Sequence, residues 1–333
     1  MADLVCFGEI MLRLSTPGHL RFGQAAEFTA NYGGAEANVA VSVAQFGGSA
    51  AYVTRVPEND LADRALAELR GLRVDVDRVV RGGSRLGVYF LEHGASVRPT
   101  KVIYDRAHSS MAEAEPGHFD WDAIFQGARW FHWSGITPAL SPGAAEACAQ
   151  ACAAARGRGL TVSFDLNYRA KLWSPAEAGR VLAPLMRHVD LCITSAEEAR
   201  TIFGFDVPAD APDKDERAAR ALCAEFGFQQ VALTARQSSS ADETDWGATL
   251  FANGEAYPSR RLRVGIVDRL GAGDAFSGAL LFSLMRGDEP PGAIEFAVAA
   301  SALQHTIYGD YNLATLAEVE ALVGGAGGGR VQR

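Results

Sequence analysis

The sequence predicts an α/β protein with a doubly wound, mostly parallel sheet that carries helices on both faces. Three observations lead to this fold class. Short, almost continuously apolar runs recur along the chain, as expected of strands that are buried on both faces of a parallel sheet. Segments with a helical spacing of apolar residues separate these runs, and such alternation is typical of crossover connections. Two further segments alternate apolar with other residues, which indicates strands of a different kind.

The apolar runs give the strands of the main sheet, which we expect at residues 4–7, 50–54, 130–133, 161–164, 191–193, 231–233 and 248–251. The segments with helical spacing give the helices, which we expect at residues 37–46, 60–70, 142–156, 176–186, 196–203, 213–226, 275–284 and 294–306. Residues 237–246 are rich in polar side chains, so we expect a loop there between two strands.

The two alternating segments, within about residues 11–30 and 85–106, interrupt the succession of strand and helix. Their pattern predicts paired antiparallel strands. Inserted into a doubly wound domain, such strands would form a small β-sheet lid over the ends of the main sheet. The lid would also present open strand edges, through which a homo-oligomer could form.

The remaining sequence shows no long linker, no internal repeat and no second core. We therefore expect a single domain over residues 1–315. Glycine and alanine alone fill residues 324–329, and a polar end follows them. Such a composition cannot bury enough apolar surface to fold, so we expect residues 324–333 to be disordered.

Composition excludes several classes of function. The 333-residue chain is 48% hydrophobic and 21% charged, which suits a globular protein with a sizeable core. Its net charge of −9 argues against nucleic acid as a partner, because proteins that bind duplex DNA are usually basic. The N-terminal segment resembles neither a signal peptide nor a membrane span, so we expect no membrane association.

The cysteine pattern points to a reducing compartment. The five cysteines are odd in number, scattered, and free of any C-x-x-C pair, so neither a zinc site nor a disulfide framework is indicated. The histidines show no spacing that is typical of metal ligands. Reduced thiols predict a cytoplasmic protein.

Residues 271–274 read Gly-Ala-Gly-Asp, and an apolar helical run follows at once. The free amide groups of such a turn, together with the helix dipole, form a seat for an anion. Asp274 could take a proton from a hydroxyl group while the amides of Gly271, Ala272 and Gly273 hold a phosphoryl group. Taken alone, however, these four residues fit an ordinary helix cap at least as well.

The longer segment 268–276, Asp-Arg-Leu-Gly-Ala-Gly-Asp-Ala-Phe, resembles the signature of the PfkB (ribokinase-like) carbohydrate kinases. The resemblance extends from about Val5 to Asn312. It implies a ribokinase-like fold, ATP with Mg²⁺ as the phosphoryl donor, and a sugar or sugar acid as the acceptor. The Asp-Arg-Leu form, which lacks the threonine usual in the family, is similar to the 2-keto-3-deoxygluconate kinase branch. A requirement for a monovalent cation stays open.

The segment Gly-Gly-Ala-Glu-Ala-Asn at residues 33–38 would read by itself as a turn and a helix cap. The resemblance instead implies a sugar pocket formed by Gly33, Gly34 and Asn38. The Gly-Asp-Tyr-Asn segment near the end of the last long helix is similar to the same branch. It implies that Asp310 contacts the substrate, where a simple turn is the alternative.

The lid strands contribute a candidate site for a carboxylate. Tyr89 and Tyr104 lie on them, and Arg106 is expected on the same strand face as Tyr104. The planar guanidinium group fits a carboxylate through two parallel hydrogen bonds, which a neutral sugar does not require. Arg169, in a segment Asp-Leu-Asn-Tyr-Arg that resembles the same branch, could meet the carboxylate, the phosphoryl group or both. A surface ion pair is its alternative role.

The nucleotide is expected at the carboxyl ends of the later strands, where ligands of doubly wound sheets collect. The family usually carries Asn-x-x-Glu after one of these strands; this chain has serine in place of asparagine and keeps the glutamate. Glu198 is therefore expected to contact the metal only indirectly, through water, although a solvated residue at a helix start is an equal alternative. The cofactor-binding candidates are Asn167, Ser195, Thr234, Arg236, Gly271 and Gly273.

The sequence thus predicts an ATP-dependent kinase that phosphorylates the 6-hydroxyl of 2-dehydro-3-deoxygluconate, as in the Entner–Doudoroff route. Kinases of a neutral sugar or of the galacto epimer are the nearest alternatives. A nucleoside kinase of the same fold would prefer an aromatic slot for its base. A sugar-binding module without activity is a fourth reading, against which Asp274 and the Gly-Ala-Gly-Asp turn argue.

Overall fold

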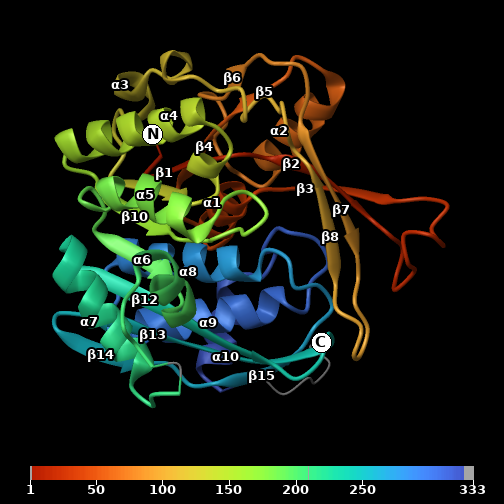
Figure 1. Cartoon of the computed structure of the whole chain (residues 1–333). Helices are drawn as coiled ribbons and strands as arrows, with labels where there is room; N and C mark the ends of the chain where they lie inside the picture. Colours follow the sequence, from red (N-terminus) through yellow and green to blue (C-terminus); the bar gives the residue numbers. More distant parts are fainter. Residues whose placement is uncertain (1, 209, 326–333) are drawn as a thin grey trace.

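The computed structural model describes residues 2–208 and 210–325 (Figure 1). Within them, a large sheet has the strand order β14-β13-β12-β11-β10-β9-β1-β4, and β15 also pairs with β13. The six strands from β4 to β12 are parallel, and the strands beyond β12 are antiparallel. The mostly parallel sheet predicted from the apolar runs is therefore confirmed. Its strands are β1 (Leu4–Phe7), β4 (Ala50–Val53), β9 (Trp130–Ser134), β10 (Thr161–Asp165), β11 (Leu191–Thr194), β12 (Gln230–Ser238), β13 (Glu243–Ala252), β14 (Glu255–Pro258) and β15 (Leu262–Gly265).

Helices cover both faces of this sheet, as the side chains of β1 show. Leu4 and Cys6 enter one buried apolar core together with residues of α1, α8 and α9. Val5 and Phe7 point the other way, into a second core with residues of α4, α5 and α7. All four side chains are buried, which is why this strand is apolar throughout. The long helices are α1 (Ala35–Gln45), α2 (Asp60–Gly71), α4 (Pro142–Gly157), α5 (Pro175–Met186), α6 (Ala196–Phe203), α7 (Lys214–Phe226), α8 (Ala272–Arg286) and α9 (Pro290–Gln304).

Short-range signals explain several helix starts. Ser174 accepts a hydrogen bond from the amide of Glu177, whose side chain bonds back to Ser174, and Pro175 occupies the first helical position of α5. The short helix α3 (Trp121–Ile124) was not predicted. Neither was α10 (Leu316–Val323), which lies beyond the expected domain end and packs against the first core through Val319.

The predicted loop over residues 237–246 is wrong. The strands β12 and β13 continue through it as an antiparallel ribbon, and only residues 239–242 connect them. Thr244 and Trp246 are buried on one side while Asp245 between them is exposed. This period-two alternation is the strand signal, and the polar composition of the segment concealed it.

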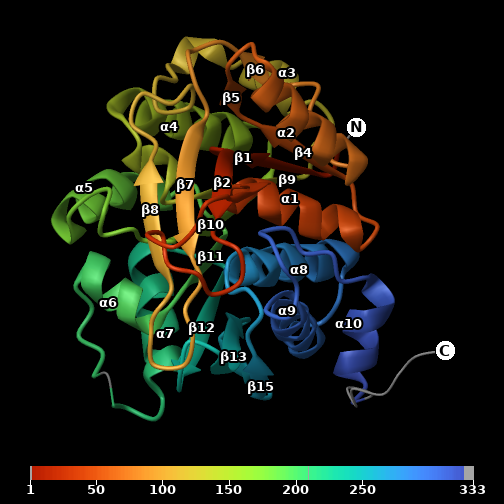
Figure 2. The same ribbon diagram turned by 90° about the vertical axis from the view of Figure 1, so that its right-hand side faces the viewer.

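The lid is a separate four-stranded sheet with the order β3-β2-β7-β8. It consists of β2 (Met11–Ser15), β3 (Thr29–Gly33), β7 (Gly87–Glu92) and β8 (Lys101–Asp105), and the pairs β2–β3 and β7–β8 are antiparallel as expected. The two hairpins join through a parallel pairing of β2 with β7. Figure 2 shows β7 and β8 passing in front of the main sheet. Among the described residues no further strand pairs with the outer strands β3 and β8, and an oligomer formed through them stays a prediction.

The described cysteines are all free, and four of them are buried: Cys6, Cys148, Cys152 and Cys192. Burial raises the pKa of these four thiols. No helix in the described part of the chain is long and apolar enough to cross a membrane. A cytoplasmic location stays a prediction. Gly324 and Gly325 form a turn, and the rest of the expected disordered tail lies outside the described residues.

Candidate active site

Two cavities meet at the start of α8. The larger, of about 860 Å³, lies at the carboxyl ends of β10, β11 and β12. The smaller, of about 90 Å³, lies between the lid and the start of α1. Four residues line both cavities: Arg169, Leu270, Gly271 and Asp274. Molecules bound in the two cavities would therefore meet beside Arg169, Asp274 and the turn before it.

The turn at residues 271–273 lines the larger cavity. Gly271 caps α8 with φ of 76°, a left-handed conformation that favours glycine, and its carbonyl accepts from the amide of Ala275 at 2.7 Å. A Cβ atom on Gly271 would lie 1.9 Å from the carbonyl oxygen of Asp310, so the position has no room for a side chain. The amides of the first helical turn have no acceptor within the helix. The turn has the conformation and close packing described, and its role as an anion seat stays a prediction.

Asp274 lies in that first turn and is partly exposed. The amide group of Asn38 on α1 donates to Asp274 Oδ2 at 2.6 Å. Burial raises the pKa of Asp274 to about 7, although the Asn38 hydrogen bond and the charge of Arg169 act in the opposite direction. A carboxylate that accepts protons near neutral pH and faces a cavity is suited to general base catalysis.

The predicted glycine pair packs against protein in this structure. A Cβ atom on Gly33 would lie 2.4 Å from Asp310 Oδ1, and one on Gly34 would lie 2.1 Å from the carbonyl oxygen of Glu9. Both glycines also line the smaller cavity, together with Asn38 and Asp310. They therefore allow the lid, α1 and the Asp310 segment to approach one another closely, which is a role that the sequence did not indicate.

Arg106 lies on the same side of the lid as Tyr104, as expected, but outside the strand. β8 ends at Asp105, and Arg106 lies just beyond it, 9% exposed, where it donates two hydrogen bonds to the buried carboxylate of Glu9. Ser109 also donates to Glu9. The guanidinium carbon lies 5.6 Å from the centre of the Tyr104 ring. Buried Glu9 requires a charged partner, and Arg106 supplies it while still lining the smaller cavity.

Asp310 is held by two lid residues. Arg13, on β2 and 1% exposed, donates to Asp310 Oδ2 at 2.6 Å and also forms an ion pair with Asp268. The hydroxyl group of Tyr89 donates to Asp310 as well. Burial opposes the charged form of Arg13, but the charges of Asp310 and Asp268 raise its pKa above the ordinary value. Sequence analysis missed Arg13. Its second partner, Asp268, accepts a hydrogen bond from the amide of Leu270, so these ion pairs are linked to the turn that begins at Gly271.

The larger cavity gathers the predicted nucleotide-side residues at three strand ends. Ser195 caps α6 by accepting from the amide of Glu198 at 3.2 Å, and Glu198 Oε1 accepts from the amide of Tyr168 at 3.1 Å. Thr234 donates to the carbonyl oxygen of Thr194 at 3.3 Å. Asn167, Arg236, Gly271 and Gly273 line the same cavity.

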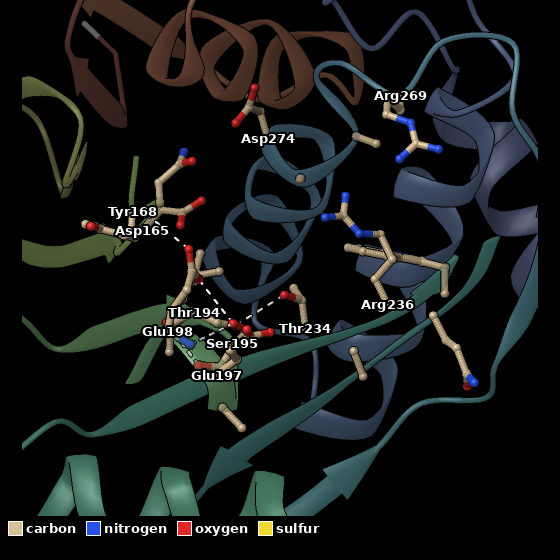
Figure 3. Close-up of a pocket in the computed structure, with 18 of the residues that line it drawn as sticks. Asp165, Tyr168, Thr194, Ser195, Glu197, Glu198, Thr234, Arg236, Arg269 and Asp274 are labelled. Carbon is tan, nitrogen blue, oxygen red and sulfur yellow. Dashed lines mark hydrogen bonds between the residues drawn. The ribbon is translucent and has the colours of Figure 1, made fainter. Parts of the chain in front are cut away.

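Asp165 is a further lining residue that sequence analysis missed, although it directly follows a predicted strand and ends β10 in the structure. Burial, followed by the charges of Glu198 and Asp274, raises the pKa of Asp165 well above its ordinary value. Figure 3 shows Asp165 and Glu198 on one side of the cavity and Arg236 and Arg269 on the other. Within residues 2–208 and 210–325, no three His, Cys, Asp or Glu side chains are grouped so that they could hold a metal ion.

Comparisons with known proteins show the family of this chain. Residues 1–315 match the model of the pfkB family of carbohydrate kinases. A 2-dehydro-3-deoxygalactonokinase of Haloferax volcanii is 36% identical over 98% of this chain and 98% of that protein. A 2-dehydro-3-deoxygluconokinase of Thermoproteus tenax is 31% identical over 93% of this chain and 90% of that protein.

The fold is also similar to that of solved structures. A 2-dehydro-3-deoxygluconokinase of Thermotoga maritima is 45% identical and superposes with a TM-score of 0.95, over 97% of this chain and 98% of that one. The ribokinase-like fold expected from the resemblance is therefore confirmed. From its sequence and its fold, the chain belongs to the pfkB family of carbohydrate kinases and is an ATP-dependent carbohydrate kinase.

Proposed function

We propose that the protein transfers the γ-phosphoryl group of ATP to the 6-hydroxyl of 2-dehydro-3-deoxygluconate and forms 2-dehydro-3-deoxy-6-phosphogluconate. The observation that carries this proposal is the position of Asp274, whose carboxylate lies where the two cavities meet. Two relatives with the name 2-dehydro-3-deoxygluconokinase support the choice of acceptor. The sugar acid would occupy the smaller cavity and the nucleotide the larger one.

In the proposed reaction, Asp274 accepts the proton of the 6-hydroxyl as its oxygen attacks the γ-phosphorus. A new O–P bond forms, the bond between the γ-phosphorus and the bridging oxygen breaks, and ADP leaves. The amides of Gly271, Ala272 and Gly273 bind the charge on the moving group. Removal of one such donor typically costs about 2.7–4 kcal/mol in the barrier. Closure of the lid excludes water, which would otherwise accept the phosphoryl group.

The carboxylate of the acceptor is assigned to the cationic side of the smaller cavity. Arg169 is exposed, lines both cavities, and forms no ion pair with a described residue. Arg106 and Tyr104 line the same space, and the Arg106 guanidinium is already oriented by Glu9. Gly34, Asn38, Tyr89 and Asp310 would face the hydroxyl and carbonyl groups. A fixed guanidinium fork favours a sugar acid over a neutral sugar.

The residues present fit a hydrated Mg²⁺ ion that is carried by the nucleotide. Asp165 and Glu198 supply carboxylate oxygens on one side of the larger cavity, and oxygen is the donor that Mg²⁺ prefers. Because the described residues hold no three-ligand group, these carboxylates would contact the ion through its water molecules. When bound, the ion would neutralise charge on the phosphates.

The galacto epimer is the second candidate acceptor. The relative from Haloferax volcanii that bears the name 2-dehydro-3-deoxygalactonokinase matches almost the whole chain. The two epimers share the carboxylate, so the contacts to Arg169 and Arg106 do not discriminate between them.

A coupled assay that follows ADP formation tests the proposal with 2-dehydro-3-deoxygluconate, its galacto epimer, fructose, ribose and adenosine. We expect the highest kcat/KM for 2-dehydro-3-deoxygluconate, with the galacto epimer next. A higher kcat/KM for a neutral sugar or for adenosine would contradict the assignment of a sugar-acid acceptor. The position of the new phosphate can be checked by ³¹P–¹H correlation spectra of the product.

A further inference from the structure

Two arginines in the larger cavity stand opposite its carboxylates. Figure 3 shows the side chains of Arg236 and Arg269 pointing toward one another. Arg236 is exposed and forms no hydrogen bond or ion pair with any residue that the structure describes. Arg269 donates from Nη2 to the carbonyl oxygen of Ala241 at 2.9 Å, while its Nε is buried without a partner.

This arrangement is electrostatically unfavourable as long as the space between the arginines holds no anion. Burial and then the charge of Arg236 lower the pKa of Arg269, and the charges of Asp242 and Asp268 offset this shift only in part. The carboxylates of Asp165 and Glu198 lie on the far side of the cavity from the two arginines (Figure 3). An anion with several oxygen atoms between the guanidinium groups would relieve the repulsion and supply acceptors for unpaired donors.

The backbone partner of Arg269 belongs to the turn that holds the tip of the lid. Ala241 and Asp242 lie in the connection between β12 and β13. The amide of Ala241 donates to the carbonyl oxygen of Ser96 at 2.8 Å, and the amide of Ser96 donates to Asp242 Oδ2 at 2.6 Å. Ser96 lies in the connection between β7 and β8, at the far end of the lid hairpin.

The contact between the two turns is also close in space. A Cβ atom on Gly94 would lie 2.9 Å from Cβ of Ala241. The amide of Ile266 donates to the carbonyl oxygen of Asp242 at 2.7 Å, which ties the same turn to the chain that leads into the anion seat. One guanidinium group thus bonds directly to the element on which the lid tip rests.

We propose that Arg236 and Arg269 bind the phosphate chain of the nucleotide, and that Arg269 couples this binding to docking of the lid tip on the β12–β13 turn. The inference rests on the proposed function, since it takes the larger cavity as the nucleotide site. In this arrangement Arg269 is a positioning residue for the lid as well as a ligand of the phosphates. Nucleotide binding would stabilise the docked lid before the acceptor is phosphorylated.

Isothermal titration without acceptor tests the phosphate contacts. The ligands are the non-hydrolysable analogue AMP-PNP and adenosine, and the variants are Arg269→Gln and Arg236→Gln. We expect each variant to bind AMP-PNP about tenfold more weakly, because a charge-assisted contact is lost, and to bind adenosine as the wild type does. Unchanged affinity for AMP-PNP, or an equal loss for both ligands, would overturn the phosphate assignment.

Arg263→Gln is the matched control. Arg263 lies on β15, is 72% exposed, and is paired with Glu243, so this variant removes one charge near the cavity without touching it. We expect its affinity for AMP-PNP to stay within twofold of that of the wild type. A tenfold loss in this control would show that net charge alone explains the effect and would overturn the assignment to the two cavity arginines.

Hydrogen–deuterium exchange of residues 93–100 and 239–242 tests the coupling. Saturating AMP-PNP should slow exchange in both segments of the wild type and of Arg263→Gln, but not of Arg269→Gln. Asp242→Asn should weaken the protection of residues 93–100 with little loss of AMP-PNP affinity. Equal protection in Arg269→Gln and the wild type would refute the coupling. Failure of the proposed acceptor would show separately, as an inactive wild type that still binds AMP-PNP.

Discussion

Both cavities have charged side chains around them, but the two sets of side chains differ in how they are paired. Around the smaller cavity two arginines are paired and buried, Arg13 with Asp310 and Arg106 with Glu9, and only Arg169, which lines both cavities, is exposed and forms no ion pair with a described residue. In the larger cavity Arg236 and Arg269 have no carboxylate partner among the described residues. The proposed acceptor side is therefore largely organised before its ligand arrives, whereas the proposed nucleotide side depends on a ligand to balance its charge. Substitutions on the first side should affect stability, and those on the second should affect binding.

The largest expected effect is at the junction of the two cavities. Asp274→Asn removes the base and keeps the shape, so kcat should fall by about 10³-fold, since a positioned base typically contributes 10²–10⁴-fold. The KM for the sugar acid should change little. Steady-state kinetics in the coupled assay measure both values. A kcat close to that of the wild type would show that another group accepts the proton.

The second-largest effect is expected at Gly271, which packs tightly against Asp310 where the two cavities meet. Gly271→Ala places a methyl group against the carbonyl oxygen of Asp310, at a left-handed φ of 76°. The turn must move, so we expect a loss of at least 10²-fold in kcat together with a lower Tm. Gly273→Ala is the control, because a Cβ atom there meets no atom within 4 Å. If both variants behave alike, the steric explanation fails.

Arg13 tests the stability of the paired side directly. Arg13→Met leaves the buried carboxylates of Asp268 and Asp310 without their cation, so the free energy of unfolding should fall by about 3–5 kcal/mol. Urea denaturation measures this loss. Neutralising both acids in the same chain should restore much of the stability. Arg236→Gln, on the unpaired side, should change the free energy of unfolding by less than about 0.5 kcal/mol. Similar losses in both variants would remove the contrast.

The pH dependence of kcat and of Tm is a further test of the role proposed for Asp274, with a smaller expected effect. With a pKa of about 7, Asp274 is ionised above that pH, so log kcat should rise with a slope of one up to about pH 7 and then level off. The folded protein also binds this proton more tightly than the unfolded chain, with its ordinary pKa of 3.8. The stability contributed by this carboxyl should thus fall as pH rises from about 4 to 7. The Tm of Asp274→Asn relative to the wild type should therefore rise over that range, and a constant difference would contradict the raised pKa.

The smallest effect concerns the choice of acceptor. Arg169→Gln should raise the KM for 2-dehydro-3-deoxygluconate about tenfold. The KM for a neutral sugar, which we expect to be high already, should stay nearly unchanged. Arg106→Ala should show the same preference with an added loss of stability, because Glu9 then stays buried without a charge partner. Equal changes in KM for both sugars would remove the argument for a carboxylate.

The sequence predicted the strands and helices of the main domain well, because residues such as Val5 and Cys6 are buried on opposite faces and both must be apolar. It could not predict the pairing inside the smaller cavity. Arg13 is separated by 255 and 297 residues from its two partners. The alternation of β2 also pointed the wrong way, since Leu12 and Leu14 are less buried than Arg13.

The sequence singled out residues that lie close together in the chain, as at residues 271–274, which line the larger cavity. Sequence analysis missed residues whose properties depend on neighbours from distant parts of the chain. Asp165 shows this, because its pKa is raised chiefly by burial and then by Glu198 and Asp274, which come from other elements. Arg269 lies two residues from the anion seat, and only the path of the β12–β13 turn reveals its contact with Ala241.

The buried cysteines can report local opening of the folded protein. Cys6 belongs to the core beneath α1 and α8, while Cys148 and Cys152 belong to the core on the opposite face. A buried, protonated thiol is inert toward alkylating reagents until its surroundings open. The order in which iodoacetamide modifies these cysteines, followed by mass spectrometry, would report which layer of the molecule loosens first and whether ligands hold the two layers unequally.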